Sequence, residues 1–389
     1  MQTISSASDE DFRRTLRAVF NEVPEDIRER FRTRTLREPD DTVASQRILN
    51  AHGLATPNWP QEWGGASWTV RQQHIYLEEL GMADVPEPLT FNVDMVGPVI
   101  AEFGSDEQKQ RFLPATANLD IWWCQGFSEP EAGSDLASLK TRAVREGSHY
   151  IVNGQKTWTT LAQHADWMFA LVRTDPYAPK RQAGISFLLI DMTTPGITVR
   201  PIELLDGSCE VNEVFFSDVR VPAENLVGQE NLGWSYAKFL LGHERARIAR
   251  VGQIRNSLAW AKSLAAGLAQ GDGTLLDDPL LRARVAELET ELLALEATQL
   301  RAMYEAESGK AGRAGAILKL RGSELQERTA ELVMDIAGPL SLATDGPEQL
   351  VPQWAQRSLP LYLTERRVGI YGGSDEVQRM VIASQMFGL

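Results

Sequence analysis

Residues 150–160 read YIVNGQKTWTT, and this stretch decides the fold class. Tyr150-Ile151-Val152 is a run of β-forming residues, and a second such run extends from Gln155 to Thr160. Between the two runs, Asn153-Gly154 tolerates the positive φ angles that a type I′ turn requires. The pattern therefore predicts a β-hairpin that turns at Asn153-Gly154.

More short runs rich in β-forming residues follow this predicted hairpin along the chain. They are Trp167–Val172, Ile185–Ile190, Ile197–Pro201 and Val214–Phe216. Short β-forming runs that follow one another closely are typical of an antiparallel sheet. Residues 120–228 are therefore predicted to form a small, mostly antiparallel β domain.

The segments on both sides of the predicted sheet have a helical period instead. In residues 1–119, Phe12 and Leu16 belong to an apolar pattern with spacings of three and four, and Ser105 precedes a predicted helix as its cap. In residues 229–389, an apolar near-heptad pattern predicts the core of a helical bundle: Val285, Leu288, Leu292 and Leu295. The predicted fold is thus α+β, with an N-terminal helical domain, a middle antiparallel β domain and a C-terminal helical bundle.

Composition excludes several classes of function. The 389 residues include 39 Lys plus Arg and 53 Asp plus Glu, and a net charge of −14 disfavours nucleic-acid or anionic-membrane binding. No apolar stretch approaches the length of a membrane span, and acidic residues near the N-terminus do not fit a secretory or transit signal, so a cytoplasmic location is expected. Cys124 and Cys209 stand outside any Cys/His cluster, which excludes a zinc framework and a disulfide scaffold, and no metal site is expected.

Residues 123–135 read WCQGFSEPEAGSD and carry groups suited to a bound cofactor. Gly133 lets a ligand approach the backbone closely, and the hydroxyls of Ser128 and Ser134 can bind flavin or phosphate oxygens. In the later stretch NGQKTWTT, Trp158 offers a flat apolar wall and Thr160 a hydroxyl. Each feature alone also fits a common turn or a sheet-core aromatic residue.

In these two stretches the sequence resembles the acyl-CoA dehydrogenase family, whose members are flavoproteins with the same helix–sheet–helix layout. Further stretches resemble family motifs in the same order along the chain: PQEWGG (60–65), EVFFSDVRVPAENLVG (213–228), ERARIA (244–249) and YGGSDEVQR (371–379). The resemblance therefore spans essentially the whole chain. It implies FAD as the cofactor and an acyl-CoA thioester as the substrate.

The resemblance also implies where the cofactor lies. The residues expected to line the flavin are Gln125, Phe127, Ser128, Gly133, Ser134, Trp158, Thr159 and Thr160. Ser134 is expected to lie near the CoA chain as well. Ser374 and Glu376 open the last predicted helix, where free backbone N–H groups can hold the adenosine or pyrophosphate part of FAD.

The catalytic base departs from the commonest family pattern. Family members remove the α-proton of the thioester with a carboxylate while the β-hydride passes to flavin N5. In many of them this carboxylate is the Glu of a Y-E-G-T motif, but the matching segment here is Tyr371-Gly372-Gly373-Ser374. Glycine cannot accept a proton, although the Gly372 N–H can still bind the thioester carbonyl.

A second group of family members carries the base on a helix of the C-terminal domain, just before an arginine. That site reads Glu244-Arg245 here, and Leu240, Ile248 and Val251 place Glu244 on an apolar helical stripe. A carboxylate on such a stripe is costly unless it is paired or functional. Glu244 is expected to be the base and Arg245 to orient it or to meet the CoA; the alternative is a structural ion pair between Glu244 and a neighbour.

Two family segments that hold the FAD of a neighbouring subunit are poorly matched, at residues 277–289 and 334–343. In this respect the chain resembles a bacterial subgroup of pimeloyl-CoA and steroid side-chain dehydrogenases, some of which combine two unlike chains. The expected partners are an electron-transfer flavoprotein and either further copies of this chain, as a homodimer or homotetramer, or an unlike family member. Two alternatives stay open: a flavoenzyme with other chemistry, such as a desulfinase, nitroalkane oxidase or monooxygenase, and a subunit without a complete FAD site of its own.

Overall fold

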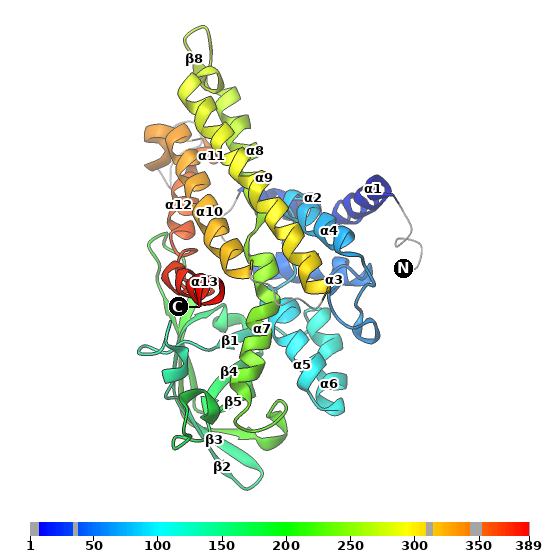
Figure 1. Cartoon of the computed structure of the whole chain (residues 1–389), viewed down its shortest axis with the longest axis vertical. Coiled ribbons are helices and arrows are strands. Elements are labelled where there is room, and N and C mark those ends of the chain that lie inside the picture. Colours follow the sequence, from blue (N-terminus) through cyan, green and yellow to red (C-terminus); the bar gives the residue numbers. More distant parts are fainter. Residues whose placement is uncertain (1–7, 34–37, 309–313, 343–351, 389) are drawn as a thin grey trace. The chain divides into compact units, whose positions relative to one another are not determined.

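The computed structural model describes residues 8–33, 38–308, 314–342 and 352–388, without the side chains of residues 33, 243–248, 353 and 387. The chain forms two compact units, and each of them combines separate segments of the sequence (Figure 1). The sheet unit consists of Pro39–Ser67 and Pro88–Glu244. The bundle unit consists of Met1–Glu38, Trp68–Glu87 and Arg245–Leu389.

The sheet unit is built around a seven-stranded sheet with the order β1-β4-β2-β3-β7-β6, in which β5 pairs with β4. The strands are β1 (Trp123–Gly126), β2 (Arg142–Glu146), β3 (His149–Thr160), β4 (Trp167–Arg173), β5 (Ile185–Asp191), β6 (Ile197–Ile202) and β7 (Val211–Pro222). The β1–β4 and β2–β4 pairs are parallel, and the other strand pairs of this sheet are antiparallel. A mostly antiparallel sheet in the middle of the chain is therefore confirmed.

The predicted hairpin turn at Asn153-Gly154 is wrong. The turn lies earlier, at Gly147, where φ is +60°, and β3 continues unbroken through Asn153-Gly154. A register irregularity lies here instead, with one residue of β3 (Asn153) opposite two of β7 (Ser217 and Asp218), and the Asn153 amide exchanges two hydrogen bonds with Asp218, of 3.0 and 2.9 Å. A long partner strand satisfies the backbone on both sides of the pair, so pairing with β7 overrides the local turn preference.

Helices and one π-helical segment complete the sheet unit: α3 (Pro39–Ala51), η2 (Phe91–Val96), α5 (Gly97–Phe103), α6 (Asp106–Ala117) and most of α7 (Gly233–Ile248). The apolar faces of η2, α5, α6 and α7 share one core with the sheet, in which Trp123, Phe169 and Leu240 are completely buried. The predicted cap is confirmed, because the Ser105 hydroxyl accepts the Gln108 N–H and Gln108 returns a capping-box bond. The core packs these helices against β1, β4 and β5.

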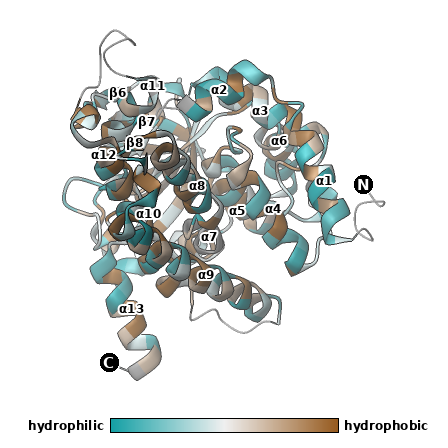
Figure 2. Ribbon diagram, turned by 90° about the horizontal axis from the view of Figure 1, so that it is seen from above, coloured by the Kyte–Doolittle hydropathy of each residue, from teal (hydrophilic) through white to brown (hydrophobic). Residues whose placement is uncertain are grey.

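Among the described residues, the bundle unit contains nine complete α-helices and a small two-stranded sheet. The elements are α1 (Asp9–Phe20), α2 (Glu25–Thr33), α4 (Val70–Met82), α8 (Val251–Gly267), β8 (Ala269–Gln270), β9 (Gly273–Thr274), α9 (Pro279–Glu307), α10 (Gly315–Ala337), α11 (Gln353–Gln356), α12 (Ser358–Glu365) and α13 (Asp375–Phe387). The predicted α9 stripe of one valine and three leucines is buried against α8 and α10, and Figure 2 shows apolar and polar residues alternating along these helices. The bundle core is therefore confirmed.

The apolar stripe that was expected to continue from Leu240 to Val251 is interrupted. α7 ends at Ile248, Arg250 has a left-handed φ of +49°, and α8 begins at Val251. A Cβ on Gly322 of α10 would lie 2.8 Å from the Ala249 Cα, so α10 packs directly against this break. The prediction of one continuous helix is wrong because a close helix–backbone contact, which only glycine permits, occupies the break.

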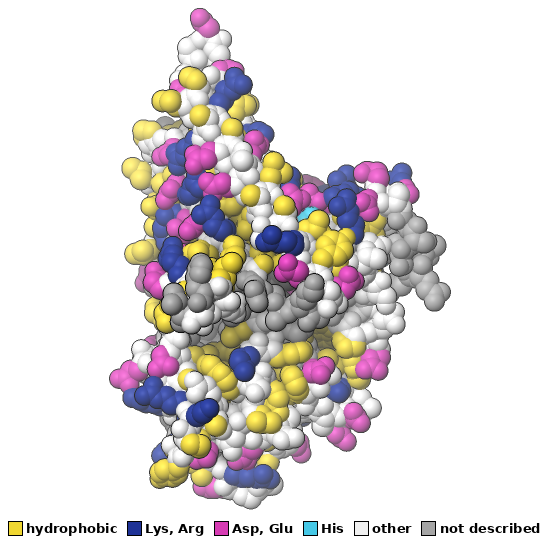
Figure 3. Space-filling model, in the orientation of Figure 1, with side chains coloured by type: hydrophobic (Ala, Val, Ile, Leu, Met, Phe, Trp, Pro, Cys, Tyr) yellow, Lys and Arg dark blue, Asp and Glu magenta, His cyan; other side chains and the backbone are white. Residues whose placement is uncertain are grey.

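The surface of the bundle unit carries both signs of charge. Figure 3 shows Lys, Arg, Asp and Glu side chains interspersed along its helices, and Arg321 and Arg328 of α10 both pair with Glu291 of α9. A short 3-10 helix at Gly338–Leu342 follows α10, and residues 343–351 lie outside the described part. Within the described ranges, none of the helices has the length and apolarity that a membrane crossing requires. Cys124 and Cys209 are both free thiols.

Candidate functional site

β1 leads into a tight turn that carries the SEPEAGSD motif. Glu129 and Ala132 close this turn with two backbone hydrogen bonds of 3.0 Å. Gly133 and Ser134 follow and are exposed, and a Cβ added at Gly133 would meet no atom within 4 Å. The space around Gly133 is therefore open to a ligand. The other predicted flavin-lining residues of this segment are buried or half-buried: Gln125, Phe127 and Ser128.

A second bulge lies near the end of β3. Lys156 faces Val214 of β7 and Thr159 faces Asn212, so β3 has one more residue than β7 between these pairs. Within the bulge, Trp158 has a φ of +57°, in the left-handed region that non-glycine residues rarely occupy. Its side chain is 60% exposed despite its large apolar surface. Strained backbone and an exposed indole at one residue are typical of a ligand-binding position.

Thr159 and Thr160 complete the predicted segment. Thr159 is buried, and its hydroxyl has no hydrogen-bond partner among the residues that the structure describes. Asn212 donates a 3.0 Å hydrogen bond to the Thr159 carbonyl, yet within the described part of the chain its own amide oxygen also has no partner. Thr160 is half-buried. A buried polar atom without a partner costs about 1–3 kcal/mol, which a ligand or water at this position would offset.

The structure brings the two predicted segments together. The Thr157 N–H donates a 2.9 Å hydrogen bond to the Ser128 carbonyl, so the bulged part of β3 pairs with the turn after β1. Trp158 follows Thr157 directly. One turn and one bulge of the sheet unit thus form a single local site.

A buried ion pair underlies this site. Lys156 is fully buried, and its ammonium lies 2.8 Å from the Glu129 carboxylate. Burial lowers the pKa of Lys156 to about 8, and the Glu129 charge opposes that shift. Burial would raise the pKa of Glu129, but the Lys156 charge and hydrogen bonds from Lys156, Lys140 and Thr141 outweigh it and lower the pKa. Both groups are therefore charged at neutral pH.

Sequence reasoning missed the roles of Lys156 and Glu129. The signal was present, because Lys156 has the same strand parity as Tyr150 and Val152, which are completely buried. A lysine at an inward position of a strand needs a charged partner. The sequence did not indicate which acid would be that partner, because the quoted stretch contains Glu129, Glu131 and Asp135.

These features fit a flat heteroaromatic group with a polar edge. The exposed Trp158 indole offers a wall against which such a ring can stack. The unpartnered Thr159 hydroxyl and the exposed Ser134 offer hydrogen bonds, and Gly133 leaves the backbone accessible. The donor set of this turn and bulge therefore suits a flavin.

The late motif lies in the bundle unit. Gly372 and Gly373 have φ of +66° and +86°, and the Gln378 amide donates to both of their carbonyls. Ser374 is the N-cap of α13 as predicted, and its hydroxyl accepts the Val377 N–H at 3.4 Å. Glu376 is exposed in the first turn of α13. The glycines thus form a tight left-handed turn that ends at a capped helix.

The expected base lies on α7, but the side chains of Glu244 and Arg245 are outside the described residues. The backbone of both residues is helical. The preceding helical turn carries Leu240, which is completely buried in the sheet-unit core. The role of Glu244 therefore stays a prediction, as do the roles of the residues expected to hold FAD and substrate.

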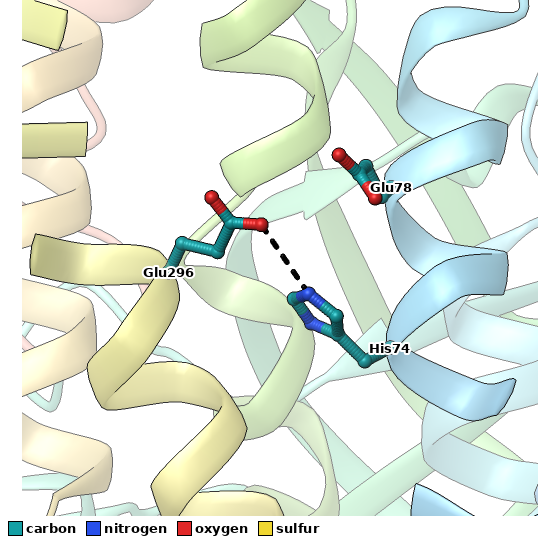
Figure 4. Close-up of side chains that lie close together, drawn as sticks. All are labelled: His74, Glu78 and Glu296. Carbon is teal, nitrogen blue, oxygen red and sulfur yellow. Dashed lines mark ion pairs between the residues drawn. The ribbon is translucent and has the colours of Figure 1, made fainter. Parts of the chain in front are cut away.

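One mixed cluster in the described part has the spacing of a metal site: His74 and Glu78 on α4 and Glu296 on α9 (Figure 4). His74 Nε2 lies 3.4 Å from Glu296. Arg255 pairs with Glu296 at 2.5 Å and with Glu78 at 3.6 Å, and Arg13 pairs with Glu78 at 2.6 Å. Because guanidinium groups already neutralise both carboxylates, the cluster is an ion-pair network that holds α4 to α9.

Comparisons with known proteins identify the family. Sequence models of acyl-CoA dehydrogenases match the chain in three consecutive blocks: the N-terminal domain at residues 6–120, the middle domain at 124–219 and the C-terminal domain at 231–387. The chain belongs to the acyl-CoA dehydrogenase family. It is thus an oxidoreductase of the flavoprotein class, and the predicted order of a helical, a β and a second helical domain is confirmed.

Relatives of this acyl-CoA dehydrogenase include several mycobacterial enzymes. The chain is 36% identical over 357 residues to acyl-CoA dehydrogenase IpdE1 of Mycobacterium tuberculosis, covering 90% of this chain and 88% of that protein. It is 30% identical to the mouse mitochondrial short-chain specific acyl-CoA dehydrogenase, covering 88% and 82% of the two chains.

Solved structures agree with these sequence relatives. A chain of the ChsE4-ChsE5 complex from Mycobacterium tuberculosis superposes with a TM-score of 0.85 at 31% identity, covering 99% of this chain and 98% of that one. A chain of the Tcur3481-Tcur3483 steroid acyl-CoA dehydrogenase gives a TM-score of 0.84 at 29% identity, covering 98% and 97%. Both of these structures are complexes of two differently named chains, so heteromeric assembly occurs among the homologues.

Proposed function

We propose that this acyl-CoA dehydrogenase uses FAD to oxidise the α–β bond of a CoA thioester, with Glu244 as the base. The observation that carries the proposal is the bulge at Trp158, which presents a strained, exposed indole and an unpartnered Thr159 hydroxyl beside the turn at residues 127–135. A flavin bound there would use all of these features.

When it is bound, FAD supplies the acceptor for the hydride that leaves the β-carbon of the thioester. Trp158 would pack against the ring, and Thr159 and Thr160 would donate hydrogen bonds to its polar edge. The turn would contribute the remaining contacts, through Gln125, Phe127, Ser128, Gly133 and Ser134. Ser374 and Glu376, at the N-terminus of α13, are proposed to hold the adenosine or pyrophosphate part.

Glu244 would take the α-proton of the thioester. An α-C–H is a very weak acid, so the base needs a raised pKa and the developing enolate oxygen needs hydrogen-bond donors. Burial raises a carboxyl pKa because it disfavours the charged form. The Gly372 N–H is proposed to bind the thioester carbonyl, Arg245 to orient Glu244 or contact the CoA, and Ser134 to contact the CoA chain.

The relatives support a narrower substrate class and a partner. One similar structure is that of a steroid acyl-CoA dehydrogenase, and the ChsE4-ChsE5 structure is a complex of two chains. We therefore propose the CoA thioester of a steroid-derived acid as substrate and an unlike family member as partner chain. An electron-transfer flavoprotein is proposed to reoxidise the flavin.

The decisive experiment is an anaerobic titration of the visible flavin absorption with a panel of acyl-CoA thioesters, including steroid side-chain acids. Bleaching by one of them is expected, together with formation of the α,β-unsaturated product. Glu244→Gln should abolish bleaching while thioester binding persists, and Glu224→Gln, at an exposed position of the sheet unit, should bleach normally. Full bleaching by Glu244→Gln would disprove the assignment of the base.

A second candidate is a subunit that completes its FAD site only with an unlike chain. It is favoured by Gly372 at the commonest base position and by the two heteromeric homologues. In that case the chain purified alone should be colourless and should bind FAD only when mixed with its partner. A yellow protein from the single chain would exclude this candidate.

A further inference from the structure

The Lys156–Glu129 pair connects three parts of the sheet unit. The Lys156 ammonium donates to the Phe127 carbonyl at 3.1 Å and to Glu129 Oε1 at 2.8 Å. Lys156 belongs to β3, whereas Phe127 and Glu129 belong to the turn after β1. The ammonium therefore ties the first residues of the turn to the strand that carries Trp158.

Glu129 also holds the far end of the same segment. Its Oε2 accepts the Lys140 N–H at 2.6 Å, and its Oε1 accepts the Thr141 N–H at 2.9 Å. Residues 129 and 141 enclose the part of the motif with Gly133 and Ser134, so one carboxylate fixes both ends of that segment. Arg173 of β4 adds hydrogen bonds to the Ala137 and Leu139 carbonyls, of 2.7 and 3.3 Å.

The position of Lys156 matters for the bulge that follows it. Lys156 is the last residue paired with β7 before the bulge, and the next N–H, that of Thr157, donates to Ser128. Trp158 comes directly after. The spacing between the Trp158 indole and the turn is thus set by two adjacent residues of β3, one through its side chain and one through its backbone.

We propose that Lys156 and Glu129 are positioning residues of the flavin site, which hold the turn at residues 127–135 and the Trp158 bulge in the geometry that binds FAD. The inference rests on the proposed FAD site and deepens it. Neither side chain is exposed enough to contact the cofactor strongly, since their side chains are 0% and 7% exposed. They act through the backbone of the turn.

The chemistry of the pair supports positioning over simple stabilisation. Two well-packed apolar side chains would fill the same space without the cost of removing two charges from water. An apolar pair would not provide directed bonds, whereas this pair makes four, to the Phe127 carbonyl, to the Lys140 and Thr141 N–H groups and between its own members. Directed bonds fix a turn in one conformation, as a preorganised site requires.

The test compares Lys156→Met with Lys140→Met in the full chain. Lys140 lies in the same segment, but its side chain is exposed and pairs with Glu131 on the surface. FAD affinity is measured by titrating the apoprotein and following flavin fluorescence, and the visible circular dichroism of the bound flavin reports its surroundings. Lys156→Met should weaken FAD binding by about tenfold or more and change the flavin dichroism. Lys140→Met should leave both within about twofold.

Glu129→Gln decides the outcome if Lys156→Met does not fold, because glutamine keeps an oxygen for the backbone N–H groups while removing the charge. It should weaken FAD binding in the same direction and change the same dichroism bands. A folded Lys156→Met or Glu129→Gln protein with wild-type FAD affinity and dichroism would overturn the positioning role, even if its melting temperature were lower. Wild-type protein that binds no FAD, either alone or mixed with its partner chain, would instead overturn the proposed function, and the positioning role with it.

Discussion

Two buried lysines, one in each unit, pair with a carboxylate at the same distance but in different surroundings. Lys156 and Glu129 in the sheet unit lie 2.8 Å apart, with side chains 0% and 7% exposed. Lys319 and Asp375 in the bundle unit also lie 2.8 Å apart, but Asp375 is 19% exposed. Both side chains of the first pair are buried, whereas in the second pair water can reach the carboxylate of Asp375.

The difference shows that the distance between the two charged groups does not by itself determine the structural role of an ion pair. Glu129 also accepts two backbone N–H groups, so its pair organises a turn between two strands. Asp375 stands in the first turn of α13, where its charge also interacts favourably with the helix N-terminus. Loss of Lys319 therefore leaves a carboxylate with water and a helix end nearby, and loss of Lys156 leaves one with neither.

The largest expected effect comes from removing each lysine in turn. Lys156→Met should reduce the free energy of unfolding by about 3–5 kcal/mol, because it leaves a buried carboxylate uncompensated. Lys319→Met should cost less, about 1–3 kcal/mol, because water can solvate Asp375. Urea denaturation of both variants, followed by tryptophan fluorescence, measures the two losses. Equal losses would mean that the exposure of the carboxylate does not control the cost.

Most of the fold could be predicted from the sequence, because each predicted element rests on a pattern that many residues share. The apolar period of α9 and the runs that became β4, β5, β6 and β7 each rest on several side chains that agree. Two local predictions failed where a single contact decided the outcome. Asn153-Gly154 continues β3 opposite a bulge in β7 instead of turning the chain, and Gly322 of α10 packs against Ala249 at the break after α7.

Less of the candidate site could be predicted from the sequence, because its geometry depends on contacts between segments that are distant along the chain. The sequence motifs predicted that residues 125–134 and 158–160 act together. In the structure, the hydrogen bond from Thr157 to Ser128 places the two segments side by side. No local pattern indicated that Trp158 would adopt a left-handed φ, because the bulge arises only when β3 pairs with β7 and the turn at once. Lys156 was detectable from its inward strand parity, but its partner was not.

The second prediction compares how the free energy of unfolding depends on pH in the wild-type protein and in Lys156→Met. The expected difference in this free energy is up to about 3 kcal/mol. The pKa of Lys156 is about 8 in the folded chain, below its ordinary value of 10.5, chiefly because of burial. Between these pH values the unfolded chain holds more protons than the folded one, so the contribution of Lys156 to the free energy of unfolding rises with pH.

Wild-type protein should therefore gain stability relative to Lys156→Met as the pH is raised from 8 toward 10.5. Denaturation midpoints of the two proteins at matched pH values measure the difference. Lys140→Met serves as the control, because its exposed position should leave the gain intact. A difference that stays constant or shrinks over this range would contradict the folded-state pKa of Lys156.

Double-mutant cycles measure the coupling within each pair, with a smaller expected effect. Glu129→Gln combined with Lys156→Met removes both charges, and Asp375→Asn combined with Lys319→Met does the same in the bundle unit. The coupling energy should be about 2 kcal/mol for Lys156–Glu129 and below about 1 kcal/mol for Lys319–Asp375. A larger coupling energy for Lys319–Asp375 than for Lys156–Glu129 would mean that the N-terminus of α13, and not burial, strengthens an ion pair.

The smallest expected effect concerns Ser374, which stands beside Asp375. Its hydroxyl accepts the Val377 N–H at 3.4 Å, so Ser374→Ala should cost about 1 kcal/mol of local stability at the start of α13. Faster hydrogen exchange of the Val377 amide measures this loss, and the Lys319–Asp375 pair should keep the rest of the helix in place. The same variant separates two roles of one hydroxyl. If Ser374 also binds the adenosine or pyrophosphate part of FAD, Ser374→Ala weakens FAD binding as well, whereas a hydroxyl that only caps the helix leaves FAD affinity unchanged while exchange still accelerates.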